Sequence, residues 1–318
     1  MNAIETHDLT RYYGTLCAVD HLSLSVNNEI FGLLGPNGSG KTTTVLMLTT
    51  LLRPTEGTAM VCGHDIVRAG EQVRRQLSYV PQDMAVDIKM TGRENVLFFA
   101  HLYGIPRAKD MTDEVLAIME LTDRADDLIR TYSGGMRRRL ELAQALVHEP
   151  AVLFLDEPTI GLDVAARKKI WEHIGGLRKN GMTIFVTTHY MDEADQYCDR
   201  VGILSKGQIV ALGKPSDLKS ELMTDVITAK VTGPVSIPAL EGIHLVGQAE
   251  DEISFTAENG REALPLLARA FAEQGAVVHA LSLREPTLDD VFLHAVGKQD
   301  EPRHFDDHQF RIMLRRRT

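Results

Sequence analysis

Short apolar runs alternate with amphipathic stretches through the first two thirds of the chain. Continuous apolar runs are typical of strands buried in a parallel sheet, and periodic stretches between them are typical of helices that cover it. The runs predict strands at Ile30–Leu34, Leu77–Val80, Ala151–Leu155 and Thr183–Thr187. The periodic stretches predict helices at Thr43–Leu52, Ala165–Lys179 and Met191–Cys198. Strands that alternate with helices in this way predict a parallel α/β core.

Three other stretches depart from that alternation. Residues 3–26 mix β-branched and aromatic residues with turn residues, which predicts short antiparallel strands. Residues 91–146 are helical in periodicity, with apolar stripes such as Val96, Phe99 and Leu102, and predict an all-helical insertion. Beyond about residue 220 the pattern predicts a small α+β domain, with strands at 226–231, 252–256 and 276–283 and helices at 262–273 and 288–295.

The expected organisation is a main domain over residues 3–220, an accessory domain over 221–297 and a tail over 298–318. The tail is charged, contains Arg315-Arg316-Arg317, and is expected to be flexible. A chain of 318 residues is long for one domain and sufficient for a main domain and a smaller one.

Composition narrows the class of protein. Hydrophobic residues make up 44% of the chain and charged residues 25%, as in ordinary soluble domains. The net charge of −10 argues against a nucleic-acid partner. The three cysteines, Cys17, Cys62 and Cys198, lie far apart without metal-ligand spacing, which is typical of a reduced cytosolic protein. We expect neither a signal peptide nor a membrane span, so any membrane role would depend on a partner.

A glycine-rich segment after the first buried strand carries the strongest chemical signal. It follows the P-loop pattern Gly-x-x-x-x-Gly-Lys-[Ser/Thr] and leads into a predicted helix. Glycines let backbone N–H groups turn toward phosphate oxygens, the lysine adds a charge near the β- and γ-phosphates, and the threonine hydroxyl can reach Mg²⁺. The segment, Gly35-Pro36-Asn37-Gly38-Ser39-Gly40-Lys41-Thr42, predicts binding of a nucleoside triphosphate.

A pair of carboxylates ends the strand at Ala151–Leu155. Ligands bind at the carboxyl ends of parallel strands, so Asp156 and Glu157 are expected at the same edge as the P-loop. Asp156 would hold Mg²⁺, and Glu157 would polarise the attacking water. Two adjacent acids after a strand are common, but combined with a P-loop they are the second half expected of a Mg-ATP hydrolase.

A third motif, Tyr132-Ser133-Gly134-Gly135-Met136, precedes Arg137-Arg138-Arg139 and an apolar helix face. Ser133 is a good N-cap, and the glycines expose N–H groups at a helix start, where anions bind. Alone, this would be read as a capped helix after a loop. Its position between the P-loop and the acidic strand favours the phosphate-binding interpretation.

These motifs, in this order, resemble an ATP-binding cassette (ABC) ATPase domain over roughly residues 3–220. The resemblance implies a P-loop ABC ATPase core with antiparallel β and α-helical subdomains and a small C-terminal α+β domain. It implies that Gln82 is the Q-loop glutamine, Gly161-Leu162-Asp163 the D-loop and His189 the switch histidine, and that Tyr13, rather than Tyr12, stacks on adenine. Taken singly, Gln82, His189 and Tyr13 would each be ordinary structural residues.

The site residues that follow from motifs and resemblance form three sets. The catalytic set is Glu157, His189 and Lys41, and the Mg²⁺ set is Thr42, Gln82 and Asp156. The ATP-binding set is Tyr13, Gly35, Pro36, Asn37, Gly38, Ser39, Gly40, Lys41, Thr42, Thr43, Gln82, Ser133, Gly134, Gly135 and Asp163.

The chain departs from the commonest signature of the family, which begins with Leu and ends with Gln, at Tyr132 and Met136. The form found here resembles bacterial exporters of the daunorubicin/doxorubicin drug-resistance type, as do Thr91-Gly92-Arg93-Glu94-Asn95 and the segment from Glu285 to Phe292. That resemblance implies an ATPase at the cytoplasmic face of the membrane that powers efflux through a separate ABC-2-like permease.

One P-loop and one signature per chain imply a head-to-tail homodimer, or a pairing with a close relative. A soluble assembly or regulatory ATPase without a permease stays open as an alternative, as does an importer subunit. A DNA or ribosome clamp is disfavoured, because only residues 83–132 lie between Gln82 and the signature and only one cassette is present.

Overall fold

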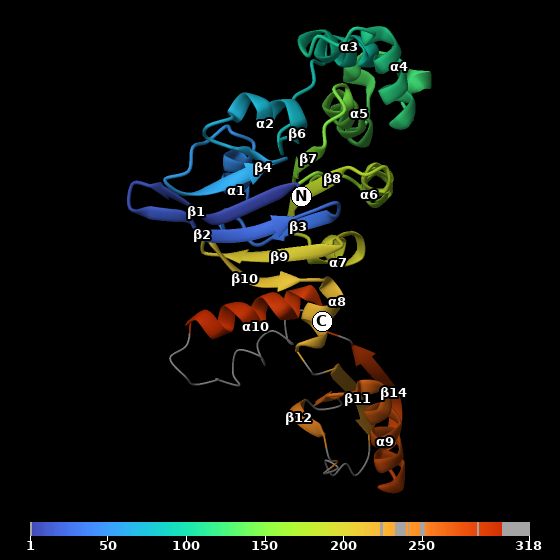
Figure 1. Ribbon diagram of the computed structural model, residues 1–318. Helices are drawn as coiled ribbons and strands as arrows, with labels where there is room; N and C mark the ends of the chain where they lie inside the picture. The colour runs from blue at the N-terminus through green and yellow to red at the C-terminus, as the bar shows by residue number, and fades with distance from the viewer. Residues whose placement is uncertain are drawn as a thin grey trace. The chain divides into compact units, whose positions relative to one another are not determined.

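Figure 1 shows the computed structural model, which describes residues 2–222, 225–232, 240, 242–248, 252–284 and 286–300. The chain divides into two compact units between Lys214 and Pro215. The first unit holds every predicted site residue.

An antiparallel sheet at the start of the first unit has the order β2-β1-β4-β5. Its strands are β1 (Ile4–Tyr13), β2 (Leu16–Val26), β4 (Glu56–Val61) and β5 (His64–Asp65). In β2 the side chains of Leu22, Leu24 and Val26 are buried while Ser23 and Ser25 are exposed. This alternation places one face of the sheet on the core.

The second sheet of this unit has the order β10-β9-β3-β8-β7-β6. Its strands are β3 (Ile30–Leu34), β6 (Leu77–Val80), β7 (Val152–Asp156), β8 (Thr183–Thr188), β9 (Arg200–Ser205) and β10 (Gln208–Gly213). The pairs from β9 to β6 are parallel, and β10 is antiparallel to β9. Parallel pairing brings the loops after β3, β6, β7 and β8 to one edge, where the site is built.

Continuous apolar strands make the core between the sheets. Every residue of β3, β7 and β8 is buried. The ring centroids of Phe31 and Phe185 lie 5.3 Å apart, and those of Phe154 and Phe185 lie 5.4 Å apart. Buried strands of this kind fix the positions of their carboxyl ends, because close-packed side chains leave little freedom to slide.

Helices complete the first unit. Four of them flank the sheets: α1 (Lys41–Leu48), α2 (Gly70–Gln76), α6 (Val164–Lys179) and α7 (Met191–Tyr197). Three others, with two short 3₁₀ turns, form the helical insertion, which gathers at the top of Figure 1. They are α3 (Gly92–Leu102), α4 (Ala108–Ile118), η1 (Thr122–Arg124), η2 (Ile129–Thr131) and α5 (Gly134–Leu146). Thr91 and Glu94 form a capping box that starts α3.

The second unit is a four-stranded antiparallel sheet of order β12-β13-β11-β14 with the helix α9 (Gly260–Glu273) packed on it. Its strands are β11 (Asp225–Thr232), β12 (Ile243–Gln248), β13 (Glu252–Ala257) and β14 (Val277–Arg284). Ile227, Phe255 and Phe271 are buried in its core. The helices α8 (Pro215–Ser220) and α10 (Leu288–Asp300) pack against each other.

The fold class expected from the sequence is confirmed, and some boundaries differ. The division lies at Lys214/Pro215 rather than near residue 220, because α8 packs on α10 of the second unit. Helix α1 ends at Leu48 rather than Leu52, since Thr50 has a positive φ of 65°. Helix α10 continues to Asp300, three residues into the expected tail. Residues 301–318, with Arg315–Arg317, and Glu285 lie outside the described residues.

Candidate active site

The segment Gly35–Thr42 joins β3 to α1 and closes over the sheet edge. Gly35 and Gly40 have φ values of 153° and 108°, where side chains other than hydrogen are strained. A Cβ at Gly35 would collide with the backbone oxygen of Leu204, and one at Gly40 with that of Ala18. The two glycines are therefore required by the path of the loop itself.

Lys41 is buried at the base of this loop, with 5% of its side chain exposed. Its Nζ donates to the backbone oxygens of Gly35 at 2.8 Å and Pro36 at 3.2 Å. Burial lowers the pKa of the Lys41 ammonium, and the nearby Glu157 carboxylate acts in the opposite direction. The buried hydroxyl of Ser39 has no hydrogen-bond partner among the described residues. A buried cation beside an unpartnered hydroxyl fits an anionic phosphate group.

Asp156 ends β7 and is 1% exposed. The hydroxyl of Thr187, on the neighbouring strand β8, donates to its Oδ1. The Tyr79 hydroxyl donates a long hydrogen bond of 3.5 Å to its Oδ2. Burial, with the Asp156 charge, raises the pKa of Tyr79 to about 12, so that this group is a donor at neutral pH. Two donors from neighbouring strands therefore orient the carboxylate.

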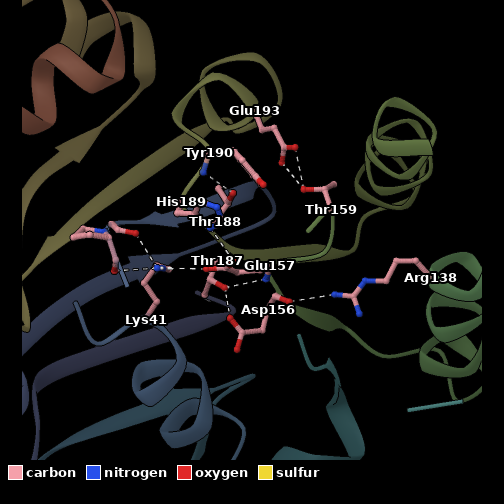
Figure 2. A network of polar contacts seen from close by, with 12 residues as sticks. Lys41, Arg138, Asp156, Glu157, Thr159, Thr187, Thr188, His189, Tyr190 and Glu193 are labelled. Atoms are coloured by element: carbon pink, nitrogen blue, oxygen red, sulfur yellow. Dashed lines mark hydrogen bonds and ion pairs between the residues drawn. The ribbon is translucent and has the colours of Figure 1, made fainter. Parts of the chain in front are cut away.

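Glu157 lies between the P-loop lysine and the strand-end histidine (Figure 2). Its Oε1 is 3.6 Å from Lys41 Nζ, and its Oε2 is 2.8 Å from His189 Nδ1. Its backbone has a φ of 48°, in the left-handed region that is uncommon outside glycine. The Glu157 N–H donates to the backbone and side-chain oxygens of Thr187 at 3.0 and 3.2 Å. The Glu157 carboxylate thus bridges the P-loop lysine and the histidine after β8.

The remaining predicted site residues lie apart from this bridge. Tyr13, at the end of β1, is 45% exposed, and the Arg11 guanidinium lies 4.9 Å from its ring centroid. Gln82 is exposed in the loop after β6. Ser133 caps α5 through Met136 N at 3.3 Å, and Asp163 caps α6 through Ala166 N at 2.9 Å.

Among the described residues, Tyr13, Ser133 and Asp163 form no hydrogen bond or ion pair with Lys41, Glu157 or His189. The structure therefore brings together the catalytic set and leaves the signature and D-loop motifs at helix starts. Thr42 and Thr43, on the first turn of α1, lie beside the P-loop glycines.

Tyr132 is one of the two departures from the commonest signature, and its buried side chain holds the segment before the signature helix in place. It is 3% exposed, and its hydroxyl donates to the Arg124 backbone oxygen at 2.6 Å. A Cβ on Gly92 would collide with this hydroxyl, although the φ of Gly92 is ordinary. Glycine is therefore needed at position 92 for space alone. Tyr132, which directly precedes Ser133, therefore bonds to η1 and packs against the start of α3.

Arg138 and Glu193 are two buried charged residues near the site that the sequence did not identify. Arg138, on α5, is 3% exposed and donates to backbone oxygens after β6 and β7. Glu193, on α7, accepts from the Thr159 hydroxyl at 2.9 and 2.7 Å (Figure 2). It also accepts from Trp171 Nε1 at 3.1 Å. In the sequence, the only indication of either residue is a charged position on the buried face of a helix.

Within the described residues, no cluster of three or more His, Cys, Asp or Glu side chains could hold a metal ion. No helix there is long and apolar enough to cross a membrane.

Comparison with known proteins agrees with this geometry. The ABC transporter family matches residues 19–160, and the family described as the C-terminal domain of ATP-binding protein DrrA1-3-like matches residues 213–296. The chain is 40% identical to the daunorubicin resistance ATP-binding protein DrrA3 of Streptomyces coeruleorubidus, over 93% of this chain and 96% of that protein.

Relatives with lower sequence identity match this chain over most of its length or share its fold. The linearmycin resistance ATP-binding protein LnrL of Bacillus subtilis (strain 168) is 36% identical over 93% of this chain and 98% of its own. The solved structure of cbiO1 from Clostridium perfringens, part of the ABC transporter complex cbiONQ, has a TM-score of 0.65. It is 27% identical and covers 70% of this chain and 92% of its own.

The chain therefore belongs to the ATP-binding, ATP-hydrolysing subunits of ABC transporters. Within that family it is of the daunorubicin/doxorubicin drug-resistance type, since residues 213–296 match the DrrA-like C-terminal domain and two proteins of that type match over 93% and 95% of the chain. Both expectations from the sequence are confirmed.

Proposed function

We propose that this chain powers the efflux of a hydrophobic drug or related compound through a separate, ABC-2-like integral membrane permease, from the cytoplasmic face of the membrane. Support comes from the DrrA-like second unit and from relatives whose names state resistance to daunorubicin and linearmycin. The runner-up is a soluble assembly or regulatory ATPase without a permease. No observation on the structure favours that alternative.

The observation that carries the catalytic roles is the bridge of Lys41, Glu157 and His189. Glu157 is 7% exposed and held at both carboxylate oxygens, so its position is fixed before substrate arrives. It accepts the proton of the attacking water as general base. His189 orients that carboxylate through Nδ1, and Lys41 neutralises phosphate charge.

The P-loop residues Gly35–Thr43 hold the phosphates of ATP, and Tyr13 stacks on adenine. Mg²⁺ is usually held by one or two carboxylates together with substrate phosphates, so a lone Asp156 with Thr42 and Gln82 suits it, and it would neutralise charge on the phosphates. In a head-to-tail homodimer, Ser133, Gly134, Gly135 and Asp163 of one copy complete the site of the other. Each of these motifs occurs once in the chain.

The experiment is co-purification of the tagged full-length chain from detergent-solubilised membranes, with hydrolysis measured in the same preparation. Wild type is compared with Glu157→Gln and with Glu172→Gln, an exposed glutamate on α6 that serves as a matched control. A multi-span partner, hydrolysis lost only in Glu157→Gln, and reduced daunorubicin accumulation in cells that express both chains would support the proposal. Hydrolysis that depends on Glu157 without any membrane partner would favour the soluble alternative.

A further inference from the structure

Arg138 is a buried guanidinium that contacts two loops of the site from the signature helix. It lies on α5, five residues after Ser133, and is 3% exposed. Its Nε donates to the Pro158 backbone oxygen at 2.9 Å. One terminal nitrogen donates to the Asp156 backbone oxygen at 3.1 Å (Figure 2). The other donates to the Pro81 backbone oxygen at 2.8 Å.

Two of these carbonyls belong to the residues on either side of Glu157. Glu157 itself has a φ of 48°, a conformation that residues with a side chain adopt only when the surroundings hold it. Arg138 fixes the carbonyl before Glu157 and the carbonyl after it. The planar, forked guanidinium can reach both at once, whereas a lysine ammonium is a single nitrogen.

The third carbonyl belongs to the loop after β6. Arg138 also pairs with Glu141 at 2.9 Å, and the other Glu141 oxygen accepts from Ala85 N at 2.7 Å. The loop from Pro81 to Ala85, which contains Gln82, is therefore held at both ends by one ion pair on α5. The pair is buried and every partner is hydrogen-bonded, the condition under which a buried ion pair is tolerated.

We propose that Arg138 is a positioning residue that holds Glu157 and the Gln82 loop in fixed register with the first turns of α5. The inference rests on the proposed role of Glu157 and goes beyond it, because it assigns the coupling between the signature helix and the general base to one side chain. A displacement of α5 is passed to the backbone on both sides of Glu157.

The next residue supplies a matched control. Arg139, on the same helix, donates from one terminal nitrogen to the backbone oxygens of Met119 and Glu120 at 2.8 and 3.2 Å. It therefore makes the same kind of contact, from side-chain guanidinium to loop carbonyls, without touching either loop of the site. Arg138→Gln and Arg139→Gln remove the same chemistry from neighbouring positions.

The experiment uses the full-length chain as wild type, Arg138→Gln, Arg138→Lys and Arg139→Gln. Amide hydrogen exchange of residues 156–160 is followed without nucleotide, and ATP affinity and kcat are measured on the same proteins. Both Arg138 variants should exchange faster at Glu157 and Ile160, whose N–H groups donate to Thr187 and Glu157. They should lose about 10- to 100-fold in kcat, as small misplacements of a catalytic group do. Affinity for ATP should stay within about threefold, since a positioning role separates kcat from binding.

A second comparison separates this inference from the role of Glu157. In a Glu157→Gln background, Arg138→Gln should cause no further loss of hydrolysis, because both changes remove the same function. If Glu157→Gln hydrolyses like wild type, the general-base role fails, and exchange at 156–160 still decides the role of Arg138.

Wild-type exchange and wild-type kcat in Arg138→Gln would overturn the inference, as would the same changes in Arg139→Gln. Should Arg138→Gln fail to fold, Arg138→Lys decides alone. It keeps the charge beside Glu141 but cannot hold both carbonyls that flank Glu157.

Discussion

Replacing Gly135 by alanine should destabilise the first unit, whereas the same change at the neighbouring Gly134 should not. A Cβ on Gly135 would lie 2.8 Å from the Cβ of Ala166 on α6. Carbon atoms in ordinary contact are about 3.5–4.0 Å apart, so the two helices are too close by roughly 0.7–1.2 Å for this methyl group. A Cβ on Gly134 would meet only Leu162 Cδ2, at 3.4 Å, the far end of a flexible side chain.

The size of the effect follows from comparing the two variants with each other. Helix propensity favours alanine over glycine by about 0.5–1 kcal/mol, and this gain is similar at both positions and cancels. The remaining difference is the cost of overpacking, typically about 1–3 kcal/mol. For a domain of 150–250 residues each kcal/mol shifts Tm by roughly 2–4 °C, so Gly135→Ala should melt about 2–12 °C below Gly134→Ala.

The assay is thermal unfolding of both variants, with hydrolysis measured beside it. Gly134 is exposed, so Gly134→Ala should melt at or slightly above the wild-type Tm, and it should lose hydrolysis if this glycine faces the nucleotide of the second copy. Adding Ala166→Gly to Gly135→Ala removes the colliding methyl group and should recover part of the lost stability. A Gly135→Ala variant that melts at or above Gly134→Ala, or that Ala166→Gly does not help, would refute the packing argument.

Three further changes separate binding, turnover and folding. Lys41→Ala should weaken ATP binding by about 1.5–3 kcal/mol, roughly 10- to 150-fold in Kd, because a charge-assisted hydrogen bond to phosphate is lost; an unchanged Kd in a nucleotide titration would contradict this. His189→Ala should lower kcat with little effect on Kd, since it contacts Glu157 at 2.8 Å, and normal turnover would make the histidine structural. Burial raises the pKa of Glu193 above its ordinary 4.5, so the carboxyl contributes stability below pH 4.5 that is lost as pH rises through its folded-state pKa. Urea unfolding over a pH series should therefore show the stability of wild type falling relative to Glu193→Gln as pH rises, and parallel curves would exclude a titrating Glu193.

The sequence predicted those parts of the fold whose signal is local. Leu77–Val80 matches β6 at both ends, and Pro81 directly after it marks the end of the strand in the sequence. The strands β4, β5, β9, β10 and β12 were not predicted. Most residues of β10 are half-exposed, because the strand lies at the edge of its sheet. It therefore has no buried apolar run that would mark it in the sequence, and it is recognised only by its pairing with β9.

Some residues of the site could likewise be predicted from the sequence, and others could not. Lys41 was predicted from the P-loop pattern, Glu157 from its place at the carboxyl end of a buried strand, and His189 from the resemblance to ABC ATPases. Arg138 could not be found from its neighbours, since its partner Pro81 is 57 positions away in the chain. In the sequence it is one of three consecutive arginines, and only the packing of α5 against the loops after β6 and β7 buries it.

Tyr132 and Gly92 make two distant positions dependent on each other over evolutionary time. The tyrosine hydroxyl fills the space where any side chain on residue 92 would begin, so a mutation at 92 is tolerated only after the residue at 132 has become shorter. Among homologues, a leucine at the position of Tyr132 should therefore coincide with freedom to vary at the position of Gly92. With Tyr132 in place, a side chain at position 92 would force the tyrosine hydroxyl away from the Arg124 carbonyl, so shortening the residue at position 132 first is the order of changes that avoids the collision.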